Sequence, residues 1–198
     1  MVRGDSIRLA PTPSVKFTYE EFLRFPEDGK RHELIGGEHH VTPSPNATHQ
    51  AVSSNLHGRL WAYLKQHPIG QVFAAPFDVV LSELDVVEPD LLYLSRAHRQ
   101  MLTEQQLRGA PDLAVEILSP GTQQVDDVTK RELYERFGVG EYWVVDPERD
   151  TVMVYRRDEE AFTRAAELSA ERADVLTTPL LPGFSMGLEE LFDSPIPA

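Results

Sequence analysis

The chain contains no cysteine among its 198 residues. This excludes a disulfide framework and a thiolate metal site. The absence is compatible with a reducing compartment, and we expect the protein in the cytoplasm. No apolar run approaches the ~20 residues that a membrane-spanning helix needs, and the N-terminal segment lacks the continuous apolar core of a signal peptide. We therefore expect no membrane partner.

Basic residues are also scarce. There are 19 Lys and Arg against 32 Asp and Glu, which gives a net charge of −13. Non-specific nucleic-acid binding depends on clustered Lys and Arg, so this balance counts against a strong nucleic-acid binder. A negative net charge does not exclude nucleic-acid binding, because a local basic groove can lie on an acidic protein.

The sequence shows no internal repeat and no low-complexity tract. Its length suits one domain, and its 41% apolar and 26% charged residues are an ordinary globular balance. Proline and polar residues predominate at the start. We expect a flexible N-terminal arm over residues 1–16 and a single domain over residues 17–198.

Apolar spacing and capping residues predict the helices. The clearest is 47–66, where apolar side chains recur every four residues along one stripe. A capping box that begins at Thr18 predicts a short helix over about 18–25. Further helices are expected near 103–108, over 126–137 and at the C-terminus.

Runs rich in β-branched and apolar residues predict the strands. The Gly36–Gly37 pair is typical of a tight hairpin turn, because glycine accepts the positive φ that such turns need. The expected strands form three hairpins and one central strand: a hairpin within 32–41, a second from 71–81 and 86–95, the central strand 112–118, and a third from 141–156. The whole is a mixed α/β domain.

Two acidic residues adjoin or interrupt apolar strand runs. Asp90 begins one run, and alternation along 112–118 places Glu116 on one face with Asp112 and Ala114. A carboxylate in an apolar strand is costly to bury unless it is paired or bound to a cation. If the two strands are neighbours, Asp90 and Glu116 converge. Two carboxylates with room for water are a typical site for Mg²⁺ or Mn²⁺.

Lys130 adds a positive charge to this picture. It shares a predicted helical face with Leu133, Tyr134 and Phe137, and that face should be buried. An ammonium group near a metal could position water or stabilise charge that develops on a phosphate. The structural alternatives are a salt bridge from Lys130 to Glu116 or Asp126, or an apolar stem whose charged end reaches water.

The order of these motifs resembles the Uma2 family of restriction endonucleases. The stretches that carry the resemblance are HELIGGE, VVEPDLLYLS, PDLAVEILSPGT, the helix with Lys130, and EYWVVDPERDTVMVYR. They extend over about residues 17–192. The resemblance implies a PD-(D/E)xK restriction-endonuclease-like core, with a central mixed β-sheet flanked by helices. It also implies a metal-dependent phosphodiesterase.

By position, the resemblance implies a role for each of four residues. Asp90 is the acid of the first motif, and Glu116 is the acid of the second. Glu38, in the GGE turn, is similar to the additional acid that this superfamily places near its N-terminal helix. The lysine normally found two residues after the second acid is Leu118 here, so Lys130 looks like its relocated substitute. Asp112 is either a supporting acid or a cap at the start of its strand.

Several other residues are alternative candidates for the site. Histidines suit transition metals, but adjacent strand histidines point to opposite faces, so His49 in a cleft is a better candidate than His39 with His40. Asp78 could support the acidic cluster or simply lie in a turn. Four arginines could contact phosphate, although a solvated charged surface is the default: Arg131, Arg136, Arg156 and Arg157.

Two functions follow from these observations. The first is a Mg²⁺- or Mn²⁺-dependent endonuclease that hydrolyses DNA phosphodiester bonds, with Asp90 and Glu116 as metal ligands and Glu38 and Lys130 as further catalytic residues. The alternative is a non-catalytic dimeric binding or regulatory protein that retains the nuclease fold, which the net charge favours. A homodimer is expected in both cases. The resemblance implies it, because cleavage of both DNA strands commonly uses two sites related by two-fold symmetry, and closed dimers are the commonest assembly. We expect the run 151–156 to be a sheet edge whose apolar surface such pairing would cover.

Overall fold

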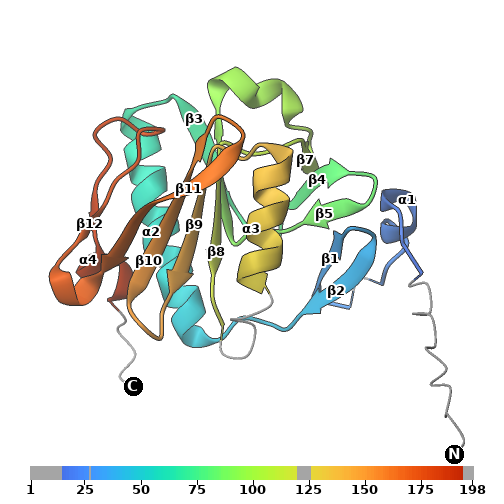
Figure 1. Ribbon diagram of the computed structural model, residues 1–198, viewed down its shortest axis with the longest axis horizontal. Helices are drawn as coiled ribbons and strands as arrows, with labels where there is room; N and C mark the ends of the chain where they lie inside the picture. Colours follow the sequence, from blue (N-terminus) through green and yellow to red (C-terminus); the bar gives the residue numbers. More distant parts are fainter. Residues whose placement is uncertain (1–14, 27, 120–125, 194–198) are drawn as a thin grey trace, which may run out of the picture.

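The structure is a computed structural model that describes residues 15–26, 28–119 and 126–193. Its elements form two main β-sheets and a small two-stranded sheet, with helices packed around them (Figure 1). In chain order they are α1 (Tyr19–Phe22), β1 (Arg31–Ile35), β2 (Glu38–Thr42), α2 (Ala47–Gln66), β3 (Gly70–Ala74), β4 (Asp78–Ser82), β5 (Asp85–Val87), β6 (Leu91–Ser95), the 3₁₀ helix η1 (Arg96–Met101), β7 (Gln106–Arg108), β8 (Leu113–Ile117), α3 (Asp126–Phe137), β9 (Glu141–Asp146), β10 (Thr151–Asp158), β11 (Ala161–Ser169), the 3₁₀ helix η2 (Ala170–Arg172), β12 (Val175–Leu176), β13 (Met186–Gly187) and α4 (Leu188–Phe192).

The larger sheet has six strands in the order β11-β10-β9-β8-β6-β3. Strands β8 and β9 pair in parallel and the other neighbours pair antiparallel, so the sheet is mixed. Helix α2 covers one face and helix α3 covers the other (Figure 1). The mixed α/β architecture with a central sheet flanked by helices, expected from the sequence, is confirmed.

Alternation along β8 divides the core into two layers. Leu113, Val115 and Ile117 pack with the apolar stripe of α2, whereas Ala114 packs with Leu133 and Tyr134 of α3. All five residues of β8 are buried, which is why this strand reads as a nearly continuous apolar run. The position of Glu116 on the α3 side follows from the same alternation.

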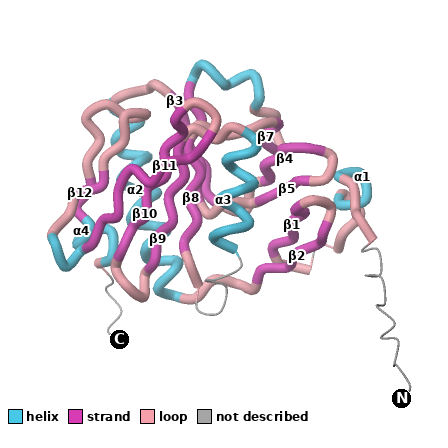
Figure 2. Tube along the Cα trace, in the orientation of Figure 1, coloured by secondary structure: helices cyan, strands magenta, loops and turns pink. Residues whose placement is uncertain are grey.

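The smaller sheet has the order β2-β1-β5-β4-β7 and lies beside the larger one (Figure 2). The two segments 71–81 and 86–95 pair with each other as expected. Their pairing is divided between the two sheets. Their outer parts, β3 and β6, pair in the larger sheet, and their inner parts, β4 and β5, pair in the smaller one. The chain passes between the sheets at Ala75–Phe77 and again at Glu88–Asp90. Asp90 therefore lies at the junction of the two sheets.

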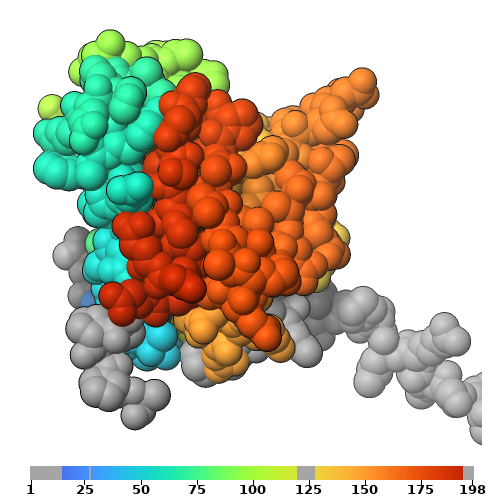
Figure 3. Space-filling view, turned by 90° about the vertical axis from the view of Figure 1, so that its left-hand side faces the viewer, coloured from blue at the N-terminus to red at the C-terminus, as the bar shows by residue number. Residues whose placement is uncertain are grey.

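The expected long helix, the short helix near the N-terminus and the C-terminal helix are confirmed as α2, α1 and α4. Asn46 caps α2 by accepting a hydrogen bond from the His49 backbone N–H at 2.8 Å. The capping box of α1 is formed by Thr18 and Glu21. In the C-terminal region, the segment that ends in α4 packs along α2, and Figure 3 shows this segment across one face of the molecule. None of the helices described is long and apolar enough to cross a membrane.

Two local expectations are wrong. Residues 103–108 do not form a helix, because Leu107 is fully buried in β7, which pairs in parallel with β4. Pairing in the sheet outweighs the weak helical preference of this polar segment. Strand β10 is also not an edge of its sheet, since β11 pairs along its whole length. The expected arm over 1–16 lies outside the described residues except for its last two.

Candidate functional site

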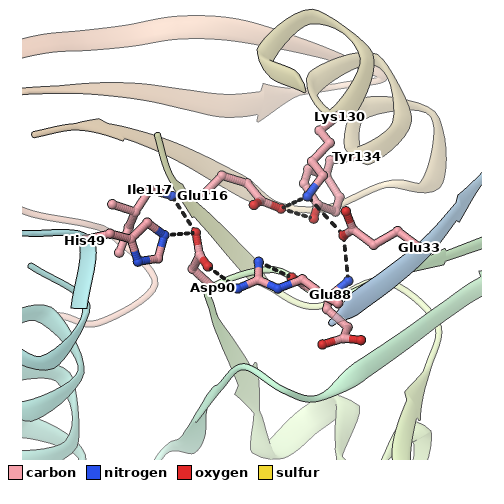
Figure 4. Close-up of polar contacts among 9 residues, drawn as sticks. Glu33, His49, Glu88, Asp90, Glu116, Ile117, Lys130 and Tyr134 are labelled. Atoms are coloured by element: carbon pink, nitrogen blue, oxygen red, sulfur yellow. Dashed lines mark hydrogen bonds and ion pairs between the residues drawn. The ribbon is translucent and has the colours of Figure 1, made fainter. Parts of the chain in front are cut away.

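The candidate site lies where the two sheets meet beneath α3 and beside the first turn of α2. Asp90 precedes β6, and Glu116 lies near the end of the neighbouring strand β8. Lys130 reaches this point from α3, His49 from α2, and Glu33 from β1 (Figure 4). The position of Asp90 between the sheets allows residues from the two layers to meet in one network.

Asp90 is the most completely bonded acid of the site. Its Oδ1 accepts a hydrogen bond from Arg31 Nη2 at 2.8 Å, and its Oδ2 accepts one from the backbone N–H of Ile117 at 2.8 Å. The Nε2 atom of His49 lies 3.1 Å from the same Oδ2. Burial alone would raise the pKa of Asp90, but the His49 contact and the charge of Arg31 lower it to about 2. Asp90 is therefore a carboxylate at neutral pH.

Glu116 has a different environment. Its Oε1 accepts hydrogen bonds from Tyr134 Oη at 2.7 Å and from Lys130 Nζ at 3.1 Å. Figure 4 shows the other carboxylate oxygen turned towards Asp90. Burial raises the pKa of Glu116 to about 7, the charge of Lys130 opposes this increase, and the charges of Asp90 and Glu33 add to it. The two acids of the site thus have pKa values on opposite sides of their ordinary range.

Lys130 is held between two buried carboxylates. Its Nζ donates to Glu116 Oε1 and also to Glu33 Oε1 at 3.0 Å. Glu33 is 2% exposed, and its Oε1 additionally accepts from the backbone N–H of Glu88 at 2.9 Å. Burial would lower the pKa of Lys130, but Glu116 and Glu33 outweigh it and raise the pKa. The ammonium is charged and fixed in position.

The structure brings Asp90, Glu116 and Lys130 to the wall of one small cavity of about 40 Å³, together with Arg31 and His49. A larger groove of about 440 Å³ adjoins it and shares Arg31, His49 and Asp90. The expected convergence of the two acids and the lysine is therefore present in the geometry. The salt bridge from Lys130 to Glu116, which was the structural alternative, is present as well.

Glu38 is not part of this cluster. It is exposed at the start of β2 and lines neither cavity, whereas Glu33 on β1 is buried and accepts a hydrogen bond from Lys130. The signal for Glu33 was available, since it is a carboxylate next to Leu34 and Ile35 in a strand run. Arg31 was also missed. Its contact with Asp90 joins residues 59 positions apart, which local pattern does not predict.

Most of the other candidates have structural partners. Asp112 accepts hydrogen bonds from the backbone N–H of Ser95 at 2.7 Å and from His98 at 2.9 Å, so it fixes the start of its strand. Asp78 is half-buried, burial raises its pKa, and its charge acts on Glu88. His39 stacks on His32 in the β1–β2 hairpin. The four arginines contact Tyr155, Asp85, Glu141 and the Glu135 carbonyl oxygen in turn.

The donor set fits a hard divalent cation with few protein ligands. Within the described residues there is no group of three or more His, Asp or Glu side chains arranged around one point. Mg²⁺ commonly takes only one or two carboxylates and completes its coordination with water and phosphate oxygens. Asp90 and Glu116 supply two such carboxylates on one cavity wall. The Asp90 oxygens are bonded to Arg31 and His49, so a cation would share or replace these donors.

The fold is that of the restriction-endonuclease-like class, in which a central mixed sheet is flanked by helices. Residues 19–189 match the model of the Uma2 family, described as "Putative restriction endonuclease", and the chain belongs to this family. A solved structure titled as a "putative nuclease belonging to DUF820" from Anabaena variabilis is similar, with a TM-score of 0.75 and 23% identity over 89% of this chain and 97% of that chain. At this identity the similarity shows the fold alone. A search of curated proteins found no match.

Proposed function

We propose that the protein is a metal-dependent endonuclease that hydrolyses phosphodiester bonds of DNA. One observation carries the proposal: Asp90, Glu116 and Lys130, from a sheet junction, a central strand and a helix, line one cavity. Membership of the Uma2 family supports the same reaction class. A second support is the pair of opposed pKa shifts, since perturbed carboxylates gather at functional sites.

Asp90 and Glu116 would hold Mg²⁺ or Mn²⁺. When bound, such a cation polarises the scissile phosphate and makes a bound water molecule a better nucleophile. Asp90 is ionised before any ligand arrives, because His49 and Arg31 lower its pKa. Glu116 is held at one oxygen by Tyr134 and Lys130, so its carboxylate is oriented before binding.

Lys130 would stabilise negative charge on the phosphate in the transition state. Its Nζ is fixed by Glu33 and Glu116, so little reorganisation is needed when charge develops. In this scheme Glu33, and not Glu38, is the additional acid, and it acts by positioning Lys130. We propose no catalytic step for the exposed Glu38.

We also propose that the active form is a homodimer, because cleavage of both strands requires two sites and two-fold dimers are the commonest assembly. Strands β11 and β3 are the edges of the larger sheet, and either could pair with a second copy. Light scattering across a wide concentration range should give twice the monomer mass. A monomer mass at every concentration would contradict this part of the proposal.

The second candidate is a non-catalytic dimeric binding or regulatory protein with the nuclease fold. Two observations favour it: the net charge is −13, and both oxygens of Asp90 already have donors within the chain. Under this alternative the network would serve only to hold the two sheets together.

Plasmid cleavage in Mg²⁺ or Mn²⁺ separates the two candidates. The native protein should nick or linearise the plasmid, and Asp90→Asn should slow cleavage by at least about 10²-fold. The matched control is Asp158→Asn, which removes the same charge from an exposed position at the end of β10 and should leave the rate unchanged. No cleavage by the native protein with either metal, or equal cleavage by Asp90→Asn, would favour the second candidate.

A further inference from the structure

The groove beside the candidate site has an unusual lining for a protein of this charge. It holds about 440 Å³ and is bordered by the first half of α2, the start of β1 and the segment Ala74–Pro76. It shares Arg31, His49 and Asp90 with the smaller cavity at Glu116 and Lys130. Any molecule in the groove would therefore lie directly beside the two acids.

Helix α2 presents a stripe of uncharged hydrogen-bonding side chains to this groove. Gln50, Ser53, Ser54 and His57 all line it. Their spacing is i, i+3, i+4 and i+7, which places them on one helical face. The buried stripe of the same helix, which starts at Val52, faces the core. The short serine side chains allow a ligand to approach the helix closely.

His49 adds an independent observation at the groove. The residue is 5% exposed, and its Nε2 contacts Asp90. Its Nδ1 is the one buried side-chain nitrogen or oxygen among the described residues that has no hydrogen-bonding partner. Buried polar atoms are almost always satisfied by protein, water or a ligand. Because His49 lines the groove, a molecule bound there, or a water that it holds, can supply the partner.

The charges of the groove are few and mixed. Lys30 directly precedes β1, Arg31 is its first residue, and the acids Glu88 and Asp90 line the same groove. Arg31 already neutralises Asp90. Most of the remaining polar lining consists of hydroxyl, amide and imidazole groups, which donate hydrogen bonds without adding fixed charge.

We propose that this groove binds a single strand of nucleic acid along its sugar–phosphate backbone and leads the strand to the Asp90–Glu116 pair. The inference rests on the proposed function and names how its substrate is held. Serine, threonine and glutamine side chains, together with Arg and Lys, make phosphate contacts in complexes of proteins with nucleic acids. Sites for small organic ligands are lined mainly by apolar and aromatic groups. Among the described residues, His49 and His57 are the only aromatic rings that line this groove, which favours a polar, extended ligand.

The test measures binding without cleavage, with the full chain in EDTA. Short fluorescein-labelled oligothymidylate and oligouridylate are titrated and followed by anisotropy, and the two probes distinguish a DNA strand from an RNA strand. Gln50→Glu and Ser53→Glu each place a negative charge in the groove on helical positions that tolerate glutamate. Gln105→Glu makes the same charge change in an exposed loop before β7 and is the control.

For whichever probe the native protein binds, each groove variant should raise the dissociation constant by about tenfold, because like charges repel across the contact. The control should remain within about twofold. Lys30 and Arg31 line the groove, and each is paired with an aspartate of the chain, so log K should fall with log salt with a slope no steeper than about −1.4, the value for two phosphates of a single strand.

Three results would overturn the inference: no binding of either probe, equal binding by the groove and control variants, or a slope steeper than about −3.5, which would place the strand on a more basic surface. The outcome is separable from cleavage. Groove-dependent binding without plasmid cleavage would keep this inference and reject the nuclease, whereas cleavage that Gln50→Glu and Ser53→Glu leave unchanged would reject only the inference.

Discussion

Glu116 and Glu141 are buried acids on adjacent strands of the same sheet, β8 and β9, yet their surroundings differ. The register pairs Glu116 with Val144 and Glu141 with Leu113, so the two carboxylates lie on opposite faces. Glu141 is 1% exposed. Its Oε1 accepts from Trp143 Nε1 at 2.8 Å and Arg156 Nε at 3.3 Å, and its Oε2 accepts from Thr178 Oγ1 at 2.7 Å.

Among the contacts of the described residues, Glu116 is hydrogen-bonded at one carboxylate oxygen only. Tyr134 and Lys130 both donate to Oε1, and the carboxylate lines the cavity that it shares with Asp90. Burial raises the pKa of Glu116 to about 7. The comparison teaches that burial of an acid is not itself a sign of function. Glu141 has both oxygens bonded and lines neither cavity, so it holds the fold together, whereas Glu116 lines a cavity and is available to a ligand.

The largest effect on stability is expected from breaking the Glu141 cluster. Glu141→Ala leaves Trp143, Arg156 and Thr178 without their shared acceptor, and it should lower the free energy of unfolding by about 3–5 kcal/mol. Urea denaturation measures this loss. Cleavage per folded molecule should not change. The control Glu160→Ala, at an exposed turn, should stay within about 0.5 kcal/mol of the native protein.

Lys130→Met should instead have a large effect on cleavage and a smaller effect on stability. Cleavage should slow by about 10²–10³-fold, because one charge stabiliser is lost from the site. The fold should lose less stability than in Glu141→Ala, since Glu116, with a pKa of about 7, can take up a proton once its cation is gone. Rates of plasmid cleavage and urea denaturation are measured on the same preparation.

A second substitution identifies the cause of any stability loss in this variant. Glu33 is the other carboxylate that Lys130 neutralises, so Glu33→Gln in the Lys130→Met background should restore part of the stability but none of the activity. The exposed Lys65→Met is the control for loss of a positive charge. Full activity in Lys130→Met would end its catalytic assignment.

The parts of the structure that sequence predicted are those whose signal is local. The stripe of α2, the Gly36–Gly37 hairpin and the buried run of β8 follow from spacing and turn chemistry, and the structure confirms all three. The convergence of Asp90 and Glu116 was also predictable, because Asp90 begins one apolar run, Glu116 interrupts another, and the two strands are neighbours.

The missed features depend on contacts between distant segments. Strand β11 has a weak pattern, with most of its residues at least partly exposed, and it exists because it pairs along β10. The division of the long hairpin between two sheets depends on how β1 and β7 pair with its inner part. Glu33 and Arg31 joined the site for the same reason, since β1 reaches the junction only when the smaller sheet has formed.

Metal binding should also distinguish Glu116 from Glu141, with a smaller effect on the free energy of unfolding than Glu141→Ala has. Mg²⁺ or Mn²⁺ at about 100 times its dissociation constant should stabilise the native protein by about 2.7 kcal/mol. Glu116→Gln should remove this stabilisation, because it replaces one of the two carboxylates. Glu141→Gln should bind the cation as the native protein does, although it is less stable. Titration calorimetry on the three proteins is the measurement, and equal binding by native protein and Glu116→Gln would contradict the assignment of Glu116 as a ligand.

The smallest effect concerns a third buried acid, Glu88, which lines the groove and has no cation bonded to its carboxyl among the contacts of the described residues. Burial, with the charge of Asp78 next, raises its pKa from 4.5 to about 7. An acid with a raised pKa in the folded state binds its proton more tightly there than in the unfolded chain. Stability from this group is therefore full below pH 4.5 and is lost as the pH rises towards and through 7.

Glu88→Gln should match the native protein at pH 4 and exceed its free energy of unfolding at pH 8, as measured by urea denaturation in EDTA. The exposed Glu104→Gln should show no such difference, and a Glu88→Gln protein less stable than the native one at pH 8 would show that the carboxylate is bonded rather than merely buried.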